Sequence, residues 1–389
     1  MTQKITLIII AMTLFCSCNL LDSLNPDNPD DQINDLFGEN WMETVPYMTM
    51  TSKKESDMFK PSITLYLAGS GTAVINWGDG SPIQQVTLSD AIYNEHIRHN
   101  YTKNTGYTVT VIGHNITCLH CSGNLLTRLD VSNNPALKEL YCFNNMFGTL
   151  DVSKNTALTH LDAKCTDITT IDLSNNTELR YLAIYTNNIT RLDLSNNHAL
   201  TELFCSHTHL TSLDVSNNPA LTFLDCASSR LTHLELSNNS ALRTLYCDFN
   251  SLTSLDLSKN KALTALGCSN NRLTGLDLSN NFALTGLGCN ANLLTELDLS
   301  NNRALSSLWC DSNKLKSLDL QNNNSLTWVS CENNLFQVDG LNALFNSLPI
   351  VKSSRILIDH NPGTNGQGLN KNIAEKKGWV FYSYPPMVC

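Results

Sequence analysis

The sequence is poor in charge and in aromatic rings: Asp, Glu, Lys and Arg make up 15% of its 389 residues, and Phe, Trp and Tyr only 7%. Basic residues are the scarcer kind of charge, 25 against 35 acidic ones, so the formal net charge is −10 at pH 7. A net negative charge argues against nucleic acid or an anionic lipid surface as a partner, because both are polyanions. We therefore expect no nucleic-acid ligand.

Long hydrophobic runs are also missing. The one sustained apolar run, residues 5–15, is too short to span a bilayer as a permanent helix. It leads into Phe15-Cys16-Ser17-Cys18, which resembles a bacterial lipobox with a small residue before the acceptor Cys18. The sequence thus predicts a lipoprotein signal peptide over 1–18, acylation of Cys18, and a flexible tether over 19–44 that is rich in Asn, Asp and Pro.

Motifs of the common catalytic families are absent: the sequence has no G-x-S-x-G, no H-E-x-x-H and no P-loop. We predict no catalytic residue, no cofactor and no metal ion. A hydrolase that uses a pair of the many carboxylates stays as the least favoured alternative, because a repeat surface offers no evident cleft for a substrate.

What the sequence does contain is a 21-residue period over more than half its length. Eleven positions at this spacing hold nine cysteines, with Ala163 and Ile184 in the two gaps. The cysteines of this column, named here the cysteine column, are Cys121, Cys142, Cys205, Cys226, Cys247, Cys268, Cys289, Cys310 and Cys331. Such a period predicts a solenoid in which each repeat buries its apolar side against its neighbours.

Each repeat divides into two half-turns, as in residues 263–273 and 274–284, and the first fits the leucine-rich-repeat template with cysteine in place of a leucine. Apolar and polar residues alternate in both halves, so both are expected to run extended. By this alternation Cys268 points into the core, and Gly267 and Asp277 point outward.

Geometry decides how the cysteine column is used. Adjacent rungs of a parallel sheet lie about 4.8 Å apart with parallel side-chain directions, whereas a disulfide needs converging Cβ atoms about 3.5–4.5 Å apart. We expect the column to stay reduced and to serve as small core side chains. Tetrahedral zinc ligation is equally unsuited to a straight row of thiols.

Two polar columns share the period. The asparagines at 124, 145, 187, 250, 271, 292, 313 and 334 are expected to bond backbone groups that the turn leaves free. Acidic residues recur from Asp130 to Asp319, and their carboxylates predict either a solvated edge bonded to neighbouring backbone and Ser or Asn side chains, or a stripe of divalent cations.

Both ends depart from the period. Residues 45–115 predict alternating strands, and Trp77-Gly-Asp-Gly80, His99-Asn-Tyr101 and Gly106-Tyr107 resemble the marks of the polycystic-kidney-disease-type (PKD) β-sandwich, a family of spacer and adhesion modules. The resemblance implies that Asp79 forms a turn and that His99 packs. Residues 337–389 predict a cap, with a helix over 340–348, a strand over 354–359 and a short helix over 370–377.

The repeat L-T-x-L-x-C-x-x-N-x-L followed by T-x-L-D-L-S-N-N, over residues 116–336, resembles the cysteine-ladder leucine-rich repeats of the internalin family of bacterial surface proteins. The fold class implied is a mostly β solenoid of α/β type, with a curved parallel sheet between the small β-sandwich and the cap. With the lipobox, the chain resembles lipid-anchored repeat proteins of Bacteroidetes. The expected location is the outer membrane, at the surface of a Gram-negative cell.

Variation among the repeats points to a binding face. Outward positions of the cysteine half-turn vary and collect nine aromatic residues, namely Tyr141, Phe143, Tyr181, Tyr185, Phe204, Phe223, Tyr246, Trp309 and Trp328. Exposed aromatics are enriched at recognition sites, so we predict a monomeric, non-enzymatic protein that binds a protein or carbohydrate ligand, including one from a host. The alternative is an envelope spacer in which these rings only pack along the sheet.

Overall fold

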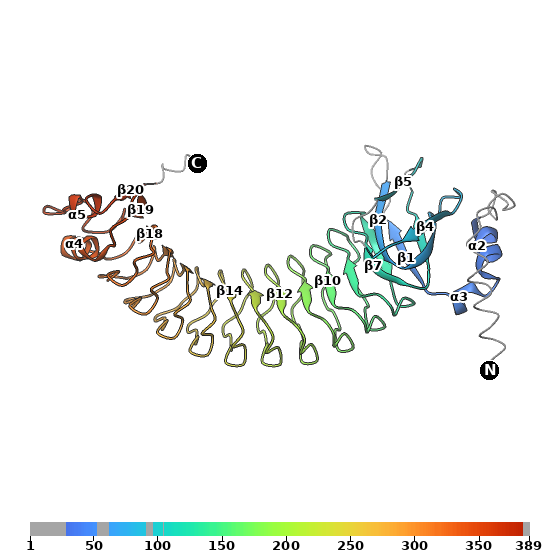
Figure 1. Cartoon of the computed structure of the whole chain (residues 1–389), viewed down its shortest axis with the longest axis horizontal. Coiled ribbons are helices and arrows are strands. Elements are labelled where there is room, and N and C mark those ends of the chain that lie inside the picture. The colour runs from blue at the N-terminus through green and yellow to red at the C-terminus, as the bar shows by residue number, and fades with distance from the viewer. Residues whose placement is uncertain (1–28, 53–61, 91–95, 104, 384–389) are drawn as a thin grey trace.

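The computed structural model describes residues 29–52, 62–90, 96–103 and 105–383. They form a curved solenoid, with a β-sandwich at the N-terminal end and a cap that contains two helices at the C-terminal end (Figure 1). The strands of the repeats line the concave side of the curve, and the loops of the second half-turns form the convex side. The concave sheet is therefore the broad face that the fold presents between its two ends.

Ten short parallel strands build the repeats, each ending one residue before the cysteine column or, in two rungs, before Ala163 and Ile184. They are β9 Glu139–Tyr141, β10 His160–Asp162, β11 Tyr181–Ala183, β12 Glu202–Phe204, β13 Phe223–Asp225, β14 Thr244–Tyr246, β15 Ala265–Gly267, β16 Gly286–Gly288, β17 Ser307–Trp309 and β18 Trp328–Ser330. Neighbouring strands pair in register at an offset of 21 residues, as in Leu245 opposite Leu266. The predicted parallel solenoid is confirmed.

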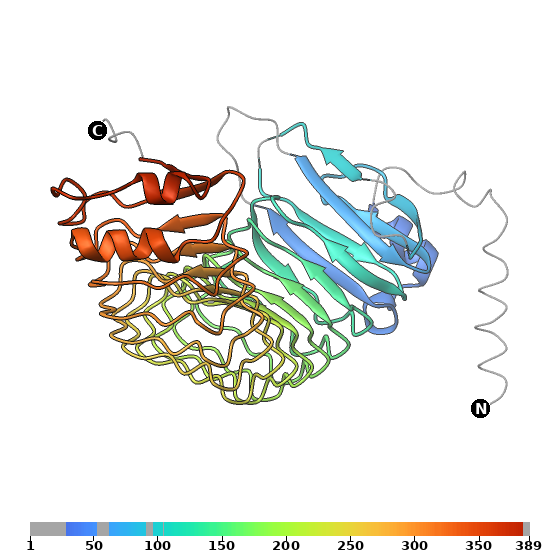
Figure 2. The ribbon, with the colours of Figure 1, turned by 60° about the vertical axis from the view of Figure 1, so that its left-hand side comes forward.

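The N-terminal sandwich has strands β1 Tyr47–Ser52, β2 Ser62–Gly69, β3 Gly71–Asn76, β4 Gln84–Leu88, β5 Ile97–Asn100, β6 Thr108–Ile112, β7 Ile116–His120 and β8 Leu126–Asp130. One sheet has the order β4-β3-β6-β1-β8. The other is continuous with the solenoid, because β7 pairs antiparallel with β2 and parallel with β9. The first repeat thus gives one strand to each sheet of the sandwich, and Figure 2 shows the strands following one another without a break.

A single apolar core runs through both parts. It extends from Met48 and Met50 in β1 to Trp379 near the C-terminus, and the buried leucines and cysteines of the repeats connect them. The sandwich covers the first rung, because β7 pairs with β2 and β8 pairs with β1.

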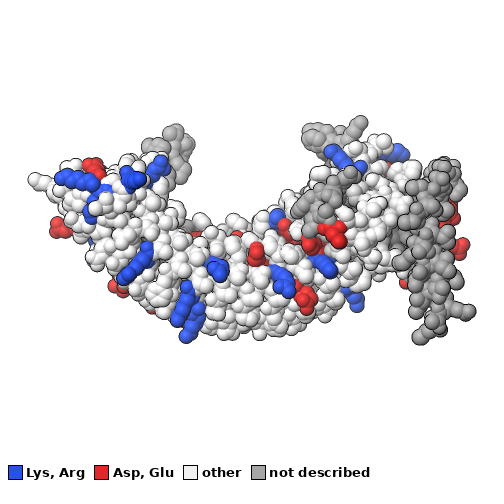
Figure 3. All heavy atoms as spheres, in the orientation of Figure 1, with Lys and Arg blue, Asp and Glu red and all other residues white. Residues whose placement is uncertain are grey.

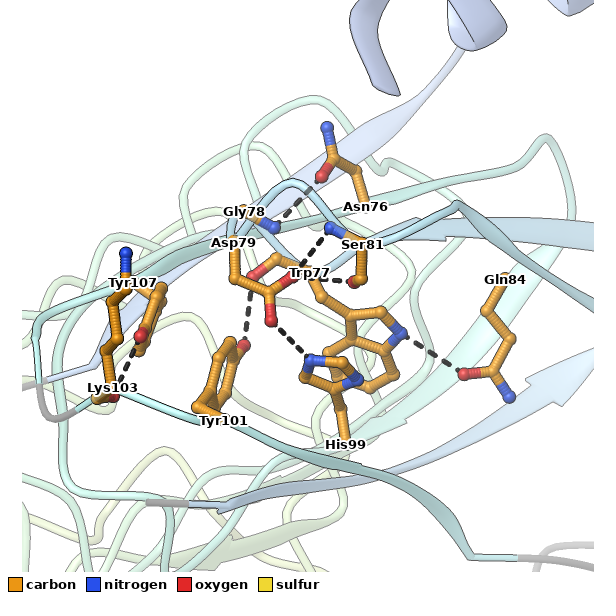
Figure 4. Close-up of polar contacts among 10 residues, drawn as sticks. All are labelled: Asn76, Trp77, Gly78, Asp79, Ser81, Gln84, His99, Tyr101, Lys103 and Tyr107. Atoms are coloured by element: carbon orange, nitrogen blue, oxygen red, sulfur yellow. Dashed lines mark hydrogen bonds and ion pairs between the residues drawn. The ribbon is translucent and has the colours of Figure 1, made fainter. Parts of the chain in front are cut away.

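The motif residues of the sandwich pack together beneath the turn after β3 (Figure 4). The imidazole of His99 stacks on Trp77 at 4.9 Å between ring centroids, and its Nε2 lies 2.8 Å from Asp79 Oδ2. Asp79 Oδ1 accepts hydrogen bonds from the backbone N–H and the hydroxyl of Ser81. Burial alone would raise the pKa of Asp79, but the bonds from Ser81 and His99 lower it. Asp79 as a turn former and His99 as a packed residue are both confirmed.

The second half-turns differ from the sequence prediction. After β8, which is extended because it pairs with β1, no strand occurs in the second half-turns of the described repeats. Each instead bends through successive turns closed by backbone bonds, for example from Asn239 N–H to Leu236 O at 3.0 Å and from Leu242 N–H to Asn239 O at 3.1 Å. In the described repeats from β9 onward, strands therefore line the concave side and turns form the convex side.

These turns bury a second asparagine column, the second Asn of each Asn-Asn pair or its equivalent, at 134, 155, 176, 197, 218, 239, 260, 281, 302 and 323. The two asparagines of a pair differ in burial, for example Asn238 exposed and Asn239 buried. From Asn155 onward the amide Nδ2 donates to two backbone carbonyls of the preceding rung, as from Asn239 to Val215 O at 2.9 Å and to Asn218 O at 3.0 Å, whereas Asn134 donates to Ile116 O and to the Met48 sulfur. Each of these carbonyls also accepts a backbone N–H within its own turn, as Val215 O does from Asn218 and Asn218 O from Leu221, so the buried amide adds a second donor that ties neighbouring rungs together.

A left-handed residue follows the cysteine column by two positions in every rung. Gly123 opens this series at a φ of 68°, and residues as large as Thr186 and Phe249 follow at 55° and 54°. Non-glycine residues rarely adopt this conformation. The first asparagine column stabilises the turn as predicted: Asn187 Nδ2 donates to the carbonyls of Ala163 and Ile184, and its Oδ1 accepts from Ile168 N–H.

The cap continues the sheet. Helix α4, Val338–Ser347, buries Leu341, Leu344 and Phe345, and strands β19 Ser354–Leu357 and β20 Trp379–Phe381 extend the parallel sheet beyond β18. The short helix α5, Asn372–Glu375, precedes Gly378, whose φ is 89°. The predicted helix, strand and second helix are confirmed, with ends that differ by a few residues.

The segment expected to be a flexible tether, 19–44, is folded from Pro29 onward. Helix α2, Pro29–Phe37, and helix α3, Trp41–Thr44, place Ile33 and Trp41 in a small apolar cluster with Val74 and Ile112 of the sandwich. The polar composition of this segment gives no sign of the helices, because two buried apolar side chains are enough to hold short helices on an existing sheet.

Candidate functional site: the concave face

The concave face consists of three outward positions per rung: three residues before, one before and one after the cysteine column. Cross-strand pairing aligns these positions into straight columns, for example His160, Tyr181, Glu202 and Phe223. Side chains in one column lie one rung apart, so each contacts the next. Every one of the nine aromatics singled out in the sequence occupies one of these columns.

Four of those aromatics form a continuous run of rings across four rungs. Tyr181 and Phe204 have ring centroids 5.3 Å apart, Phe204 stacks on Phe223 at 4.5 Å, and Phe223 meets Tyr246 edge-on at 5.9 Å. His160, which the sequence reasoning did not include, extends the run by stacking on Tyr181 at 5.8 Å. We call these five residues the aromatic run. Tyr181, Phe204, Phe223 and Tyr246 therefore follow one another in four adjacent rungs.

The other aromatics lie at the two ends of the face. Trp309 and Trp328 are neighbours at 6.5 Å. At the N-terminal end Tyr141 and Phe143 both contact His120 at 5.6 Å. Tyr246 and Trp309 are the most open of the nine, with 40% and 39% of their surface exposed.

Tyr185 is not part of the aromatic run. It lies instead at one side of Lys164, whose ammonium is 5.4 Å from its ring centroid and 4.3 Å from that of Phe143. The same ammonium is 2.8 Å from Asp162 Oδ2. Burial disfavours the charged lysine, yet the Asp162 carboxylate more than compensates and raises the pKa of Lys164. A cation is thus held between two rings and a carboxylate on this face.

Between β14 and β17 the outward side chains of the strands are small. Its strands carry Ala265, Gly267, Gly286 and Gly288 at the outward positions. Gly267, although outward as predicted, is covered, because the ring of Tyr246 and the carboxylate of Asp248 lie where a Cβ would stand. Tyr246 and Asp248 therefore meet over this glycine, and a larger residue would separate them.

The cysteine column points away from this face. The nine cysteines have no exposed surface and are free thiols, as predicted. Burial raises the pKa of each, Cys247 and Cys268 far above the ordinary value. A thiolate nucleophile requires the opposite environment.

Carboxylates differ between the two sides of the solenoid. On the convex side Asp277 Oδ1 accepts the N–H of Ser279 at 2.8 Å, the bond that recurs along the column and lowers the pKa of Asp277. On the concave face, burial raises the pKa of both Asp248 and Asp311. Their partners are neutral, namely Ser269 N–H for Asp248 and the hydroxyl of Ser330 for Asp311.

One pocket opens at the N-terminal end of the concave face, where β4 approaches β2 and β7. It has a volume of about 490 Å³, and its lining includes Tyr66, His120 and Tyr141. Tyr66 stacks on His120 at 5.0 Å and contacts His96 on another side at 4.4 Å, so its ring is enclosed by imidazoles. Burial lowers the pKa of His120, which favours its neutral form.

Cys18 and the rest of the predicted signal peptide lie outside the described residues. Within the described part of the chain, no helix is both long enough and apolar enough to cross a membrane, and no group of three His, Cys, Asp or Glu side chains is placed to hold a metal ion.

Solved structures with the same architecture are found among bacterial leucine-rich-repeat proteins. No protein-family model and no curated protein matches the chain. The functional domain of InlJ from Listeria monocytogenes, described as including a cysteine ladder, is 35% identical with a TM-score of 0.57; the match covers 62% of this chain and 53%, about half, of that one. The internalin inlF from Listeria monocytogenes is 20% identical with a TM-score of 0.56, and 69% of this chain matches 87% of that chain. A leucine-rich-repeat protein of Leptospira interrogans is 17% identical with a TM-score of 0.56, over 65% of this chain and 74% of that one. The fold of this chain is a leucine-rich-repeat solenoid with a cysteine ladder.

Proposed function

We propose that the protein is a non-enzymatic recognition protein that binds a protein or carbohydrate ligand through the concave face. The observation that carries this proposal is the gathering of aromatic side chains on one side of the sheet, with Tyr246 and Trp309 about two-fifths exposed. Large aromatic side chains supply much of the energy at binding surfaces. The likeness to an internalin domain supports a role in recognition.

A structural spacer is the second candidate, and the ring contacts of the aromatic run favour it. Stacking such as that of Phe204 on Phe223 at 4.5 Å stabilises neighbouring rungs whether or not a ligand exists. The two functions differ most at Tyr246 and Trp309, because these rings expose surface that packing alone does not use.

Changing Tyr246 and Trp309 together to serine tests the proposal. Arrays of glycans and of extracellular proteins would first be probed with the labelled wild-type protein, and the dissociation constants of its ligands then compared between variants. We expect affinity to fall at least tenfold, about 1.4 kcal/mol, with little change in melting temperature. Phe282→Ser is the matched control, since its ring is 55% exposed but lies outside the concave columns. Unchanged affinity in the double variant would show that the concave face is not the binding surface, whereas a protein with no ligand on either array would favour the spacer.

We further propose that the protein is anchored by lipid on Cys18 in the outer membrane of a Gram-negative cell, at its surface, and that the N-terminal sandwich is a PKD-like spacer module. The lipobox-like Phe15-Cys16-Ser17-Cys18 supports the anchor. We expect Cys18→Ser to move the protein from the membrane fraction to the soluble one, because the only sustained apolar run is too short to span a bilayer. Retention of the variant in membranes after a carbonate wash would rule the anchor out.

A further inference from the structure

The charge of the concave face is one-sided. In its three outward columns from Tyr181 to Glu332 there is no Lys or Arg, whereas five carboxylates are present. These are Glu202, Asp225, Asp248, Asp311 and Glu332. Basic side chains do occur on the flank of the solenoid (Figure 3), so the absence is specific to this face.

The carboxylates at the centre of this stretch have no cationic partner. Asp225 accepts bonds from the hydroxyl of Ser206 at 2.8 Å and the N–H of Ala227 at 3.1 Å. Among the described residues the ion pairs are His99 with Asp79 and Lys164 with Asp162, and neither involves the stretch from Tyr181 to Glu332. A half-buried carboxylate without a cation is unfavourable, because burial removes water that hydrates its charge.

At both ends of the stretch the chain supplies its own cation to the rings. Lys164 lies between Phe143 and Tyr185 and pairs with Asp162. At the other end the guanidinium carbon of Arg355 lies 6.0 Å from the ring centroid of Trp328 and 5.5 Å from that of Tyr382. The middle rungs offer the same groups, with Tyr246 beside Asp248 over Gly267 and Trp309 in the rung of Asp311, but no Lys or Arg of the described residues pairs with these carboxylates or lies over these rings.

We propose that this middle segment, from Phe204 to Asp311, binds lysine or arginine side chains of a protein partner, each held by an aromatic ring and a carboxylate as Lys164 is held. This inference rests on the proposed recognition function and names the chemistry of its ligand. Cation–π contact and charge pairing act together in such a site and gain strength from partial burial. A neutral or acidic ligand would leave the carboxylates unpaired.

The probe is a short peptide of alternating lysine and glycine, compared with one in which glutamate replaces lysine. Binding to the purified protein would be followed by calorimetry and by the fluorescence of its tryptophans. We expect the lysine peptide to bind and the glutamate peptide not to bind, and we expect the double variant Asp248→Asn with Asp311→Asn to weaken lysine-peptide binding at least tenfold. Equal binding of the two peptides, no binding of the lysine peptide, or unaltered affinity of the double variant would overturn the inference.

The stability of the Asp248 and Asp311 double variant separates a binding role of these carboxylates from a structural one. Because the folded-state pKa of each carboxyl is raised, ionisation reduces stability as the pH rises through that value. Asparagine removes this effect, so at pH 7 the double variant is expected to be at least as stable as the wild type while it binds less. The control, Asp277→Asn with Asp298→Asn on the convex side, should keep peptide affinity and lose stability, since both pKa values are lowered by serine N–H groups. A double variant that loses binding only because it unfolds would contradict the proposal.

Failure of this inference can be told apart from failure of the proposed function. If the Tyr246 and Trp309 double variant loses its ligands from the arrays but no lysine peptide binds, the face recognises a ligand of other chemistry. If that variant keeps its ligands, the concave face is not the binding surface.

Discussion

Asn239→Ala is expected to lower the free energy of unfolding by about 2 kcal/mol, since two buried hydrogen bonds worth about 0.5–1.5 kcal/mol each would be lost. Asn239 is fully buried, and its Nδ2 donates to Val215 O and Asn218 O of the preceding rung. Alanine has no donor, and the position is fully buried. Urea unfolding followed by circular dichroism would measure the change.

The adjacent Asn238 gives a matched control. Its side chain is exposed and donates to Ser216 O at 3.1 Å, where water can take its place. Asn238→Ala should therefore change the free energy of unfolding by no more than about 0.5 kcal/mol. Equal losses for the two alanine variants would show that the second asparagine column does not hold the convex turns together.

The second large effect is expected at Cys247, which has no exposed surface. Cys247→Asp should destabilise the fold by several kcal/mol, because it would put an unpaired carboxylate into the core. Cys247→Ala should cost only about 1–3 kcal/mol, as other core truncations do. Melting curves of the two variants would distinguish a charge effect from a cavity effect, and similar losses would contradict a dry apolar column.

Thiol titration of the native protein checks the same column without mutation. Burial raises the pKa of its thiols far above the ordinary value, so they should react only after denaturant is added. Cys165, which is partly exposed, should react before them. Disulfides found by intact mass between residues 121 and 331 would contradict the parallel geometry of the rungs.

Sequence period was sufficient to predict the solenoid because every rung repeats the same local pattern. Alternation then placed the nine aromatics on one side of the sheet, and pairing in register turned that placement into contacts such as Phe204 on Phe223. The carboxylates of the convex side were also foreseen as a hydrogen-bonded edge. In each case the information lies within one repeat or between identical positions of two repeats.

Other features depend on contacts that no local pattern contains. The burial of Asn239 and the exposure of Asn238 cannot be separated by alternation, since a turn rather than a strand decides which amide faces the core. The position of Lys164 follows from side-chain direction in neighbouring columns, and the charge of the concave face is visible only when three columns are read together. The fusion of β7 and β8 with the sandwich rests on antiparallel pairing between distant segments.

The second asparagine column has a consequence for how such a protein can change in length. Its amides reach back by 21 and 24 residues to carbonyls that every rung supplies alike. Removing or duplicating one whole repeat therefore leaves each donor with an equivalent acceptor, whereas a shift of one residue would misplace all donors at the junction. Gene-level gain or loss of complete units can accordingly lengthen or shorten the concave face, and so set the size of what it spans, while both ends of the molecule remain as they are.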